Sequence, residues 1–489
     1  MRIARNSYRD LCRIFSQPLF LQRTFSSHDD KPPLPVIPRA GSHRSPWEVL
    51  KEEFRALKQG NFTSESNNKV PRESDILIIG GGLIGSSVAY WLKQRNPKAM
   101  SITIVERDPS YTRAASVLSV GGIRHQFSLP ENVQLSMFTS EFLRNIKQHL
   151  SVLDMDPPDI QFNLQGYLFL ASPEGAEQLV RNAKMQRDIG AKVELMSRER
   201  LASKFPWLNL QGIELGTYGL EGEGWFDPWT LIRAMKQKNL SLGVKYVNGE
   251  VIGFDKQTYR VAGTDGYEDR ESINSVQIKS EGEIYQSQFA IVINCAGPWA
   301  GNVAELAGIG TGKGILSLSL PVEPRKRYVY VFHCPKGPGI ESPFLIDPAG
   351  FYFRREGLGS HFLCGMSPTE EDEPAIDNLQ VDYDYFHNTI WPHLAHRVSK
   401  FESLKLMSAW SGFYDYNYAD QNLVIGNHPY FHNFYFANGL SGHGIQHAPA
   451  IGRALMEYII DGNFESIDLS RFKFDRFLSN DLLTEVGIV

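Results

Sequence analysis

The sequence predicts an α/β protein, α+β overall, in which a Rossmann-type nucleotide-binding domain is made from discontinuous pieces. An apolar run at 75–79 leads straight into a glycine-rich turn and a helix. A second apolar run at 289–294, and a glycine-rich turn at 439–444 followed by a helix over 449–460, suit the same nucleotide site. With 489 residues, the chain is long enough for two or three domains. We therefore expect a second domain whose pieces lie between those of the first.

The first glycine-rich turn has the spacing of a dinucleotide-binding motif, with Gly80, Gly82 and Gly85 in a G-x-G-x-x-G pattern. Gly80 permits the tight turn, Gly82 lets the backbone approach a pyrophosphate, and Gly85 lets the helix pack closely on the strand. The amino end of that helix offers unpaired N–H groups to phosphates. The next apolar run ends in Glu106, where a carboxylate can accept hydrogen bonds from ribose hydroxyls. Together these features predict a dinucleotide site.

Composition excludes several classes of protein. Hydrophobic residues make up 42% and charged residues 21% of the chain, as in folded globular proteins. The chain has 50 Lys+Arg against 55 Asp+Glu, and no basic stripe alternates with aromatic residues, so we expect no nucleic-acid partner. The longest apolar runs are strand-sized, far below the roughly 20 residues of a transmembrane helix. We expect a protein without a transmembrane span, soluble or at most peripheral.

Residues 1–25 differ in composition from the rest of the chain. They contain five arginines and one acid, with apolar residues interspersed, which is typical of a mitochondrial transit peptide. The run from Arg23 to Ser27 resembles a processing site and places the mature start near Ser26. Loss of this segment would change the net charge from −5 to −9. Residues 26–73 are expected to form a linker with one amphipathic helix between Ser45 and Gly60.

Three other patterns indicate no further site. The glycine-rich stretch 308–314 lacks the Lys-Ser/Thr ending of a phosphate loop and reads as a flexible connection. His443 and His447 are spaced i,i+4, but no His-Glu-x-x-His pattern is present, so we expect no metal. The four cysteines include no Cys-x-x-Cys pair and indicate no disulfide framework.

The motifs together resemble those of the D-amino-acid-oxidase-like FAD-dependent oxidoreductases, which include sarcosine oxidases, glycine oxidase and dimethylglycine dehydrogenase. The matching segments are the first glycine motif with Glu106, the run from Asn294 to Trp299 and the run 434–446, in this order. The resemblance implies FAD as the cofactor and an interleaved antiparallel-sheet domain for the substrate. In this family, the last turn and its helix face the pyrimidine edge of the flavin, where a helix amino end stabilises negative charge.

Carried over to this chain, the resemblance implies a set of domain boundaries. The FAD-binding domain would comprise 74–150, about 215–315 and 405–465; the substrate-type domain would comprise about 151–214 and 316–404, with 466–489 as a carboxyl-terminal tail. The residues expected to bind FAD are Gly80, Gly82, Leu83, Ile84, Gly85, Glu106, Arg107, Ser116, Gly121, Gly122, Val251, Ala296, Gly297, Trp299, Gly412, Gly439, Gly442, His443, Gly444, Ile445 and Gln446.

Non-covalent binding of FAD is also implied by the resemblance. Relatives that attach the flavin covalently use a histidine in an early loop or a cysteine further on. This chain has Ser119 at the first place and Gly412 or Phe413 at the second.

Three residues are candidates for catalysis by the same resemblance. In family amine oxidases, the flavin takes a hydride from a carbon beside an amine, and water hydrolyses the imine. Arg124 matches the region of a carboxylate anchor, and Lys326 lies where relatives place a basic residue above the flavin. Gln446 replaces a lysine that holds the carboxylate in monomeric sarcosine oxidases, which weighs against an amino-acid substrate. Further candidates for the pocket wall, or for packing on a sheet, are Tyr352, Arg354, Tyr414 and Tyr416.

Further segments, including 118–132, 222–229 and 320–335, resemble one branch of the family, a mitochondrial factor for the assembly of respiratory complex I. This resemblance implies a matrix protein, free or associated with the inner membrane, whose partners are complex I subunits or other assembly factors. The alternative is an active FAD-dependent dehydrogenase or oxidase that acts on the CH–NH bond of an N-methyl or secondary amino acid such as sarcosine. The sequence leaves both open.

Overall fold

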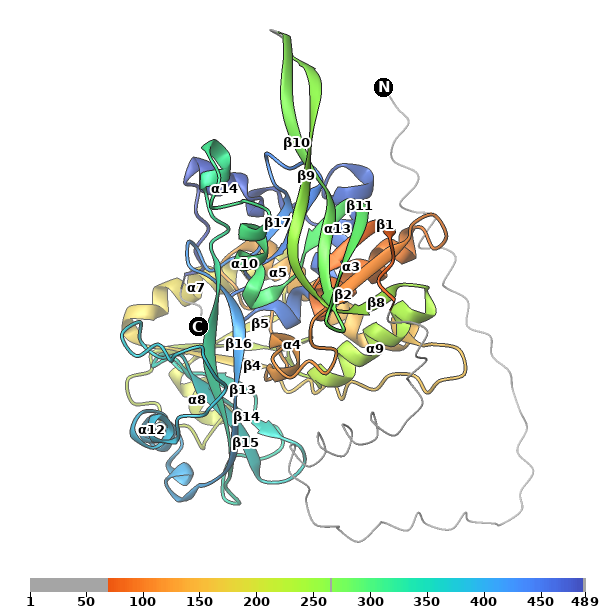
Figure 1. Ribbon diagram of the computed structural model, residues 1–489. Coiled ribbons are helices and arrows are strands. Elements are labelled where there is room, and N and C mark those ends of the chain that lie inside the picture. Colours follow the sequence, from red (N-terminus) through yellow and green to blue (C-terminus); the bar gives the residue numbers. More distant parts are fainter. Residues whose placement is uncertain (1–68, 264–265, 487–489) are drawn as a thin grey trace, which may run out of the picture. The chain divides into compact units, whose positions relative to one another are not determined.

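The computed structural model describes residues 69–263 and 266–486, and of residues 261–263 and 266–270 it describes the backbone alone. The predicted transit peptide and the linker helix lie outside the described residues. The strands of the described part form two eight-stranded sheets and a short ribbon in which β3 (Gly122–Ile123) pairs with β7 (Gly224–Trp225) (Figure 1).

The first sheet is built around parallel strands in the order β17-β18-β11-β1-β2-β8. Five of these strands run parallel, and β17 is antiparallel to β18 at one edge. The strands are β1 (Glu73–Ile79), β2 (Ile102–Glu106), β8 (Lys245–Asn248), β11 (Glu283–Asn294), β17 (Val424–Asn427) and β18 (Phe434–Asn438). The sheet therefore joins three distant parts of the chain, as the sequence motifs require.

The central strand β1 is apolar without alternation because both of its faces are covered. Leu77 and Ile79 pack on the side of α10 (Ala300–Leu306). Ile76 and Ile78 face the other side, against helices α3 (Leu83–Arg95) and α13 (Gly444–Asp461). The strand pairs in parallel with β11 on one side and β2 on the other, so it lies in the centre of the sheet.

Helices α3 and α13 cross in close contact over one face of this sheet. A Cβ atom at Gly452 of α13 would lie 2.2 Å from the hydroxyl oxygen of Ser87 on α3. The indole of Trp91 on α3 also donates a hydrogen bond to the carbonyl of Pro449 on α13, at 2.8 Å. Small residues at the crossing let the two helices approach, so that their amino ends open on the same region.

A long hairpin extends the first sheet on the side of β11. It consists of β9 (Glu250–Gly263) and β10 (Gly266–Ser280), and β10 pairs with both β9 and β11. In Figure 1 the green hairpin rises well beyond the other strands of its sheet. Its base packs on the core through Val251, Val276 and Ile278.

The second sheet is largely antiparallel, in the order β16-β12-β15-β14-β13-β4-β6-β5, with a single parallel pair between β13 and β4. Its strands are β4 (Tyr167–Ala171), β5 (Val193–Ser197), β6 (Leu215–Gly219), β12 (Val322–His333), β13 (Phe344–Ile346), β14 (Phe351–Glu356), β15 (His361–Met366) and β16 (Lys405–Asn417). Strands β6 and β16 lie within the ranges predicted for the FAD-binding domain, but both belong to the second sheet, because β6 pairs with β4 and β5 and β16 pairs with β12. Strand β16 pairs with β12 from His333 to Val322, along almost its whole length.

The two faces of the second sheet have different surroundings. One face carries an aromatic core that includes Tyr330, Phe353 and Phe362 and is covered by α12 (Trp391–Arg397) and its flanking turns. The opposite face carries Tyr167 and Phe344, whose rings stack at 4.2 Å between centroids. This second face looks towards the first sheet and forms one wall of the site described below.

The described part of the chain contains further helices. They are α4 (Ala115–Leu118), α5 (Pro130–Arg144), α6 (Ile146–Leu150), α7 (Pro173–Ile189), α8 (Arg198–Lys204), α9 (Pro228–Ser241), α11 (Tyr383–Tyr385) and α14 (Asp475–Ser479). Short single turns are η1 (Gly297–Trp299), η2 (Gly314–Ser317), η3 (Phe386–Ile390), η4 (Ser399–Ser403) and η5 (Ser470–Phe472).

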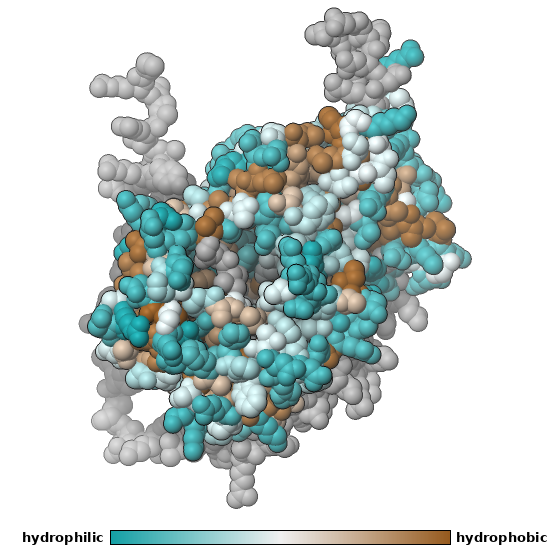
Figure 2. Space-filling view, turned by 90° about the vertical axis from the view of Figure 1, so that its left-hand side faces the viewer, coloured by the Kyte–Doolittle hydropathy of each residue, from teal (hydrophilic) through white to brown (hydrophobic). Residues whose placement is uncertain are grey.

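On the face shown in Figure 2, apolar residues form separate groups among hydrophilic ones. Across the described residues, none of the helices combines the length and the apolar composition that crossing a membrane requires.

Candidate functional site

A cavity of about 1000 Å³ lies between the carboxyl ends of the parallel strands and the inner face of the second sheet. It is lined by the ends of β1, β2 and β11, by the amino ends of α3 and α13, and by strands β12 and β16. Ligands bind at this edge of open α/β sheets. The predicted residues that line it are Gly80, Gly82, Leu83, Ile84, Glu106, Arg107, Ser116, Gly122, Arg124, Val251, Ala296, Gly297, Trp299, Gly412, Gly442, His443, Gly444, Ile445 and Gln446.

The predicted residues that do not line the cavity are Gly85, Gly121, Gly439 and Lys326. Two of them pack against backbone instead. A Cβ atom at Gly85 would lie 2.0 Å from the carbonyl oxygen of Gly80, and one at Gly121 would lie 2.1 Å from that of Phe226. These glycines shape the turns around the cavity without forming its surface.

We call the region around the first glycine motif, Glu106 and the start of α3 the nucleotide end of the cavity. Gly80 has φ +102°, a conformation that favours glycine, and its Cβ position is blocked by the carbonyl of Cys295 at 2.3 Å. Gly82 differs, because a Cβ atom there would meet only the hydroxyl oxygen of Ser116, at 3.7 Å. The space beside Gly82 therefore belongs to the cavity, where a phosphate could approach the backbone.

Glu106 ties the end of β2 to the glycine turn. One carboxylate oxygen accepts a hydrogen bond from the N–H of Gly81 and the other from the N–H of Asp108, both at 2.8 Å. Burial raises the pKa of this carboxyl above its ordinary value, and the two N–H donors act in the opposite direction. Both oxygens are thus held in place at the cavity wall.

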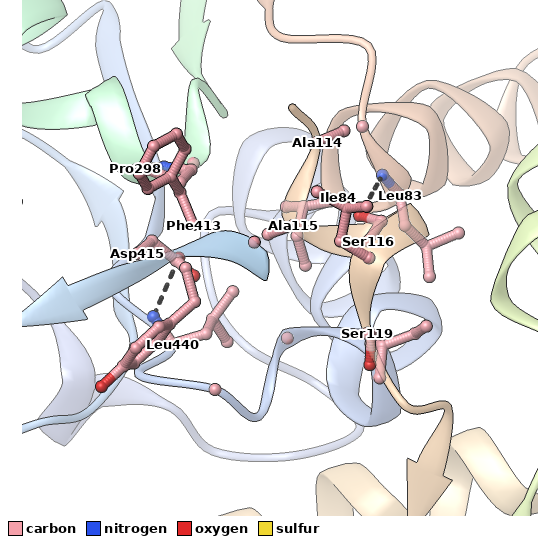
Figure 3. Close-up of a pocket in the computed structure, with 18 of the residues that line it drawn as sticks. Leu83, Ile84, Ala114, Ala115, Ser116, Ser119, Pro298, Phe413, Asp415 and Leu440 are labelled. Atoms are coloured by element: carbon pink, nitrogen blue, oxygen red, sulfur yellow. Dashed lines mark hydrogen bonds between the residues drawn. The ribbon is translucent and has the colours of Figure 1, made fainter. Parts of the chain in front are cut away.

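Figure 3 shows two walls that face each other across the cavity. On one wall, Ser116 accepts a hydrogen bond from the N–H of Leu83 at 3.2 Å. On the other, Asp415 of β16 accepts one from the N–H of Leu440 at 3.0 Å. The first bond caps one amino-terminal N–H of α3, and the second orders the turn that leads into α13.

Asp415 is a wall residue to which the sequence analysis gave no role. Its carboxyl is buried, and desolvation raises its pKa to about 6, against the N–H donors of the 439–440 turn, which lower it. The acid is sequence-adjacent to Tyr414, but only the pairing of β16 with β12 brings it to the cavity.

Arginines and aromatic rings surround the turn that follows β11. The guanidinium of Arg107 lies 3.8 Å from the ring centroid of Trp299, and that of Arg113 lies 5.3 Å from it. The ring of Phe413 meets Trp299 edge-on, with centroids 5.9 Å apart. Two cations at the cavity beside the glycine motif favour an anionic group such as a pyrophosphate.

We call the opposite region the Arg124 end, formed by Arg124, His443, Gln446 and Glu485. Arg124 is 4% exposed, and its guanidinium lies 5.0 Å from the ring centroids of both Phe127 and Phe169. Burial lowers the pKa of Arg124, while Tyr167, Glu485 and Glu223 act in the opposite direction. A guanidinium remains protonated in such a site, so it presents a buried positive charge to the cavity.

His443 contacts the Arg124 guanidinium directly, with 3.1 Å between its Nε2 atom and the Nη2 atom of the arginine. Because a guanidinium only donates, the histidine nitrogen accepts, and the imidazole is neutral. Burial holds the pKa of His443 well below its usual value and lowers that of His447 to about 3, with the Arg124 charge adding to both effects.

The side-chain carbonyl oxygen of Gln446 is hydrogen-bonded to other protein groups. This atom accepts hydrogen bonds from the N–H of Arg124 at 2.9 Å and from the hydroxyl of Ser136 at 3.3 Å. The side chain therefore fixes the backbone of the anchor arginine to the first turn of α13.

Strand geometry separates Lys326 from the cavity. Successive residues of a strand point to opposite faces, and Arg327 and Val329 line the cavity. Lys326 points the other way and donates to the side-chain oxygen of Asn378 at 3.3 Å. Arg327 donates to both carboxylate oxygens of Glu373 at 2.8 Å and to the hydroxyl of Tyr414 at 2.9 Å. The basic residue on this wall is thus Arg327.

Of the aromatic and basic candidates on the second sheet, Tyr352 and Tyr414 line the cavity, whereas Arg354 and Tyr416 do not. Arg354 instead donates two hydrogen bonds to the carbonyl of Val120, at 2.8 and 3.0 Å. It thereby holds the loop before β3 against the second sheet.

These features fit FAD as a cofactor. The glycine turn leaves space at Gly82, Glu106 stands where a ribose would bind, and two helix amino ends open on the cavity. The family model for FAD dependent oxidoreductases matches residues 75–458. The chain therefore belongs to this family of flavoproteins, and the predicted D-amino-acid-oxidase-like fold and FAD cofactor are confirmed.

Curated relatives match most of the chain. It is 53% identical over 438 residues to FAD-dependent oxidoreductase domain-containing protein 1 of Bos taurus, which covers 88% of this chain and 90% of that protein. The protein of the same name from Xenopus laevis is 52% identical over 426 residues, covering 86% of this chain and 85% of that protein. L-Proline dehydrogenase from P. horikoshii shares the fold, with a TM-score of 0.69, 23% identity and coverage of 85% of this chain and 100% of the other.

Proposed function

We propose that this protein is an FAD-dependent oxidoreductase of the mitochondrial matrix that oxidises the CH–NH bond of a small amine bearing a carboxylate, and that it also acts in the assembly of respiratory complex I. The observation that carries the first part is the buried guanidinium of Arg124 in the cavity. A guanidinium at a cavity wall can hold a carboxylate through two charge-assisted hydrogen bonds.

The residues at each end of the cavity have separate roles in this proposal. The glycine motif and the amino end of α3 would hold the phosphates of FAD, and Glu106 would bind its ribose. Bound FAD supplies the acceptor for a hydride from a carbon beside nitrogen. Arg124 would hold the substrate carboxylate, with its guanidinium kept in position by neutral His443.

Contacts around the cavity favour a small substrate. Tyr352 and Phe344 line the cavity with apolar ring surface, and Tyr414 is fixed by its hydrogen bond with Arg327. Gln446 leaves its carbonyl oxygen bound to Arg124. Carboxylate binding would then depend on Arg124, without the lysine found in monomeric sarcosine oxidases.

The test of oxidation is anaerobic mixing of the flavin-loaded protein with sarcosine, dimethylglycine, proline and a set of D-amino acids. Fast bleaching of the visible flavin band by one of them supports the proposal. An unchanged flavin spectrum with the whole panel over hours contradicts it and leaves a flavoprotein with a structural or assembly role.

The role in complex I assembly is supported by the sequence segments that resemble a branch with this role, and by the composition of residues 1–25. It needs no turnover, because a folded flavoprotein surface can bind partners without chemistry. It also agrees with location in the matrix, since the predicted transit peptide would direct the chain there.

Affinity capture from mitochondria tests this role with three proteins: the wild type, Gly82→Val to block flavin binding, and Arg124→Met to remove the anchor alone. Recovery of complex I subunits or assembly factors with the wild type supports the role, and its absence contradicts it. Loss of capture with Gly82→Val alone would show that the partners need bound FAD. A fusion of residues 1–25 to a fluorescent protein tests mitochondrial import directly.

A further inference from the structure

The carboxyl-terminal segment from Leu483 to Val486 takes part in the cavity wall, although the sequence analysis gave this tail no role. Thr484 and Glu485 line the cavity together with Arg124, His443 and Gln446. Glu485 is also one of the charges that act on the pKa of the Arg124 guanidinium. The segment therefore lies at the Arg124 end of the cavity.

The carboxylate of Glu485 is held by a set of donors at the start of helix α5. It accepts hydrogen bonds from the N–H of Ser128 at 2.6 Å, from the N–H of Leu129 at 3.2 Å and from the side-chain amide of Asn132 at 2.7 Å. The hydroxyl of Ser128 donates to it as well. A carboxylate at a helix amino end is favoured by both the free N–H groups and the helix dipole.

The contacts on either side of Glu485 differ in kind. Leu483 is buried, and its N–H donates to Asp420 at 3.1 Å. Asp420 is in turn held by the buried ion pair with Arg476, at 2.6 Å. After Glu485, the N–H of Val486 donates to the Ser128 hydroxyl at 2.8 Å, and its carbonyl accepts from Asn182 at 3.0 Å.

The segment is thus anchored in the core by the buried side chain of Leu483, whereas Glu485 and Val486 are held by hydrogen bonds. Thr484, which precedes Glu485, is exposed to solvent. Hydrogen-bonded surface segments open at much lower free energy than the core to which they are attached.

We propose that residues 483–486 form a gate at the Arg124 end of the cavity, anchored at Leu483 and latched by Glu485 on the amino end of α5. Opening of the latch widens this end of the cavity and admits small solutes to the cofactor. This inference does not depend on turnover or on the role in complex I assembly, because it concerns access to bound FAD.

The same face of α5 connects the latch with the anchor arginine. Asn132 binds Glu485, and Ser136, one helical turn later, binds the carbonyl oxygen of Gln446 that also accepts from the Arg124 N–H. Arg124, Gln446 and Glu485 are thus joined through side chains of α5 in one hydrogen-bonded network.

The experiment measures quenching of the bound flavin's fluorescence by acrylamide, a neutral solute, and by iodide, an anion. Two variants weaken the latch from opposite sides, Glu485→Gln and Ser128→Ala. Asp481→Asn is the matched control, because it removes the same charge from an exposed residue of the same tail. We expect the quenching constants to rise about threefold or more in both latch variants and to stay unchanged in the control.

Quenching constants equal to those of the wild type in both latch variants would overturn the gate. So would an equal rise in Asp481→Asn, since that would mean general loosening of the tail. Flavin content after gel filtration is measured alongside. Loss of flavin from both latch variants also overturns the proposal, because a gate that opens leaves the cofactor site intact. None of these readouts requires a substrate, so a failure here is distinct from a failure of the proposed oxidation.

Discussion

The two ends of the cavity differ in whether backbone or side chains form them. At the nucleotide end, the decisive features are backbone conformations and missing side chains, as at Gly80 and Gly82, and they lie within a short stretch of chain. At the Arg124 end, the decisive features are side chains from distant segments, such as Arg124, Gln446 and Glu485. The comparison teaches that a local motif can define a cofactor site, whereas the Arg124 end depends on how distant elements are brought together.

Substitution of Gly85 should have the largest effect, because it disrupts the packing of helix α3 on the glycine turn at the nucleotide end. A Cβ atom at this position would lie 2.0 Å from a backbone oxygen, which has little freedom to move. We expect Gly85→Ala to lower the free energy of unfolding by about 3 kcal/mol and to abolish flavin retention. Urea unfolding and flavin content measure both.

The control for that prediction is Gly175→Ala in helix α7, where a Cβ atom meets nothing closer than 3.9 Å. It should leave stability unchanged or raise it, since alanine is the better helix former. Equal stability of Gly85→Ala and the wild type would contradict the close packing of α3 on the glycine turn.

Gly82→Val should separate cofactor binding from folding at the same end. Its side chain would enter the cavity, because only the Ser116 hydroxyl lies near, at 3.7 Å. We expect flavin content to fall at least about tenfold, while the free energy of unfolding of the flavin-free protein changes by less than about 1 kcal/mol. A variant that purifies with normal flavin content would show that Gly82 is not part of the phosphate site.

Arg124→Met tests the other end of the comparison. Loss of a two-pronged charged hydrogen bond should weaken binding of a carboxylate substrate about 100-fold, or raise its KM by that factor, with flavin content unchanged. Arg124→Lys keeps the positive charge but loses the planar pair of N–H donors. Its affinity for the carboxylate substrate should therefore lie between those of the wild type and Arg124→Met. If both variants bound substrate like the wild type, Arg124 would not be the anchor.

Asp415→Asn should have the smallest effect, and we expect it to change only how the free energy of unfolding depends on pH. Burial raises the pKa of Asp415 to about 6 from an ordinary 3.8. Its contribution to stability is therefore fully present below pH 3.8 and is lost as the pH rises through about 6. The asparagine keeps an acceptor for the Leu440 N–H and cannot ionise.

We therefore expect wild type to lose about 2 kcal/mol relative to Asp415→Asn between pH 4 and pH 7.5 in the flavin-free protein. Urea titrations at the two pH values measure this difference. Parallel pH profiles for the two proteins would show that the carboxyl does not titrate with a raised pKa.

Sequence reasoning located most of the nucleotide end because its signals are local. The apolar run predicted at 75–79 forms the strand Glu73–Ile79, and the apolar run that ends in Glu106 forms the strand Ile102–Glu106. The helix expected from 449 begins earlier, at Gly444, since Pro449 lies within its first turns. A glycine pattern of fixed spacing between a strand and a helix carries this information without any knowledge of the rest of the fold.

The second sheet shows where such reasoning reaches its limit. Lys326 and Arg327 are adjacent basic residues, and the sequence offered no means to decide which of them faces the cavity. The alternation of β12 decides it, because a shift of one residue exchanges the two faces of a strand. Asp415 and Glu485 were missed for a related reason, since neither has a partner nearby in the chain.

By itself, the sequence determined the fold class, a dinucleotide site and the positions of the three segments that meet at it, because strand, glycine turn and helix amino end are encoded within about 20 residues each. The choice of FAD followed from the resemblance of these segments to a known family. The tertiary structure decided which side chains share the cavity. Arg124 lies more than 300 residues before Gln446 and Glu485, and the contacts of these residues are set by the packing of α5 and α13 on the sheet. Contacts of that kind depend on a register and a crossing that no local pattern contains.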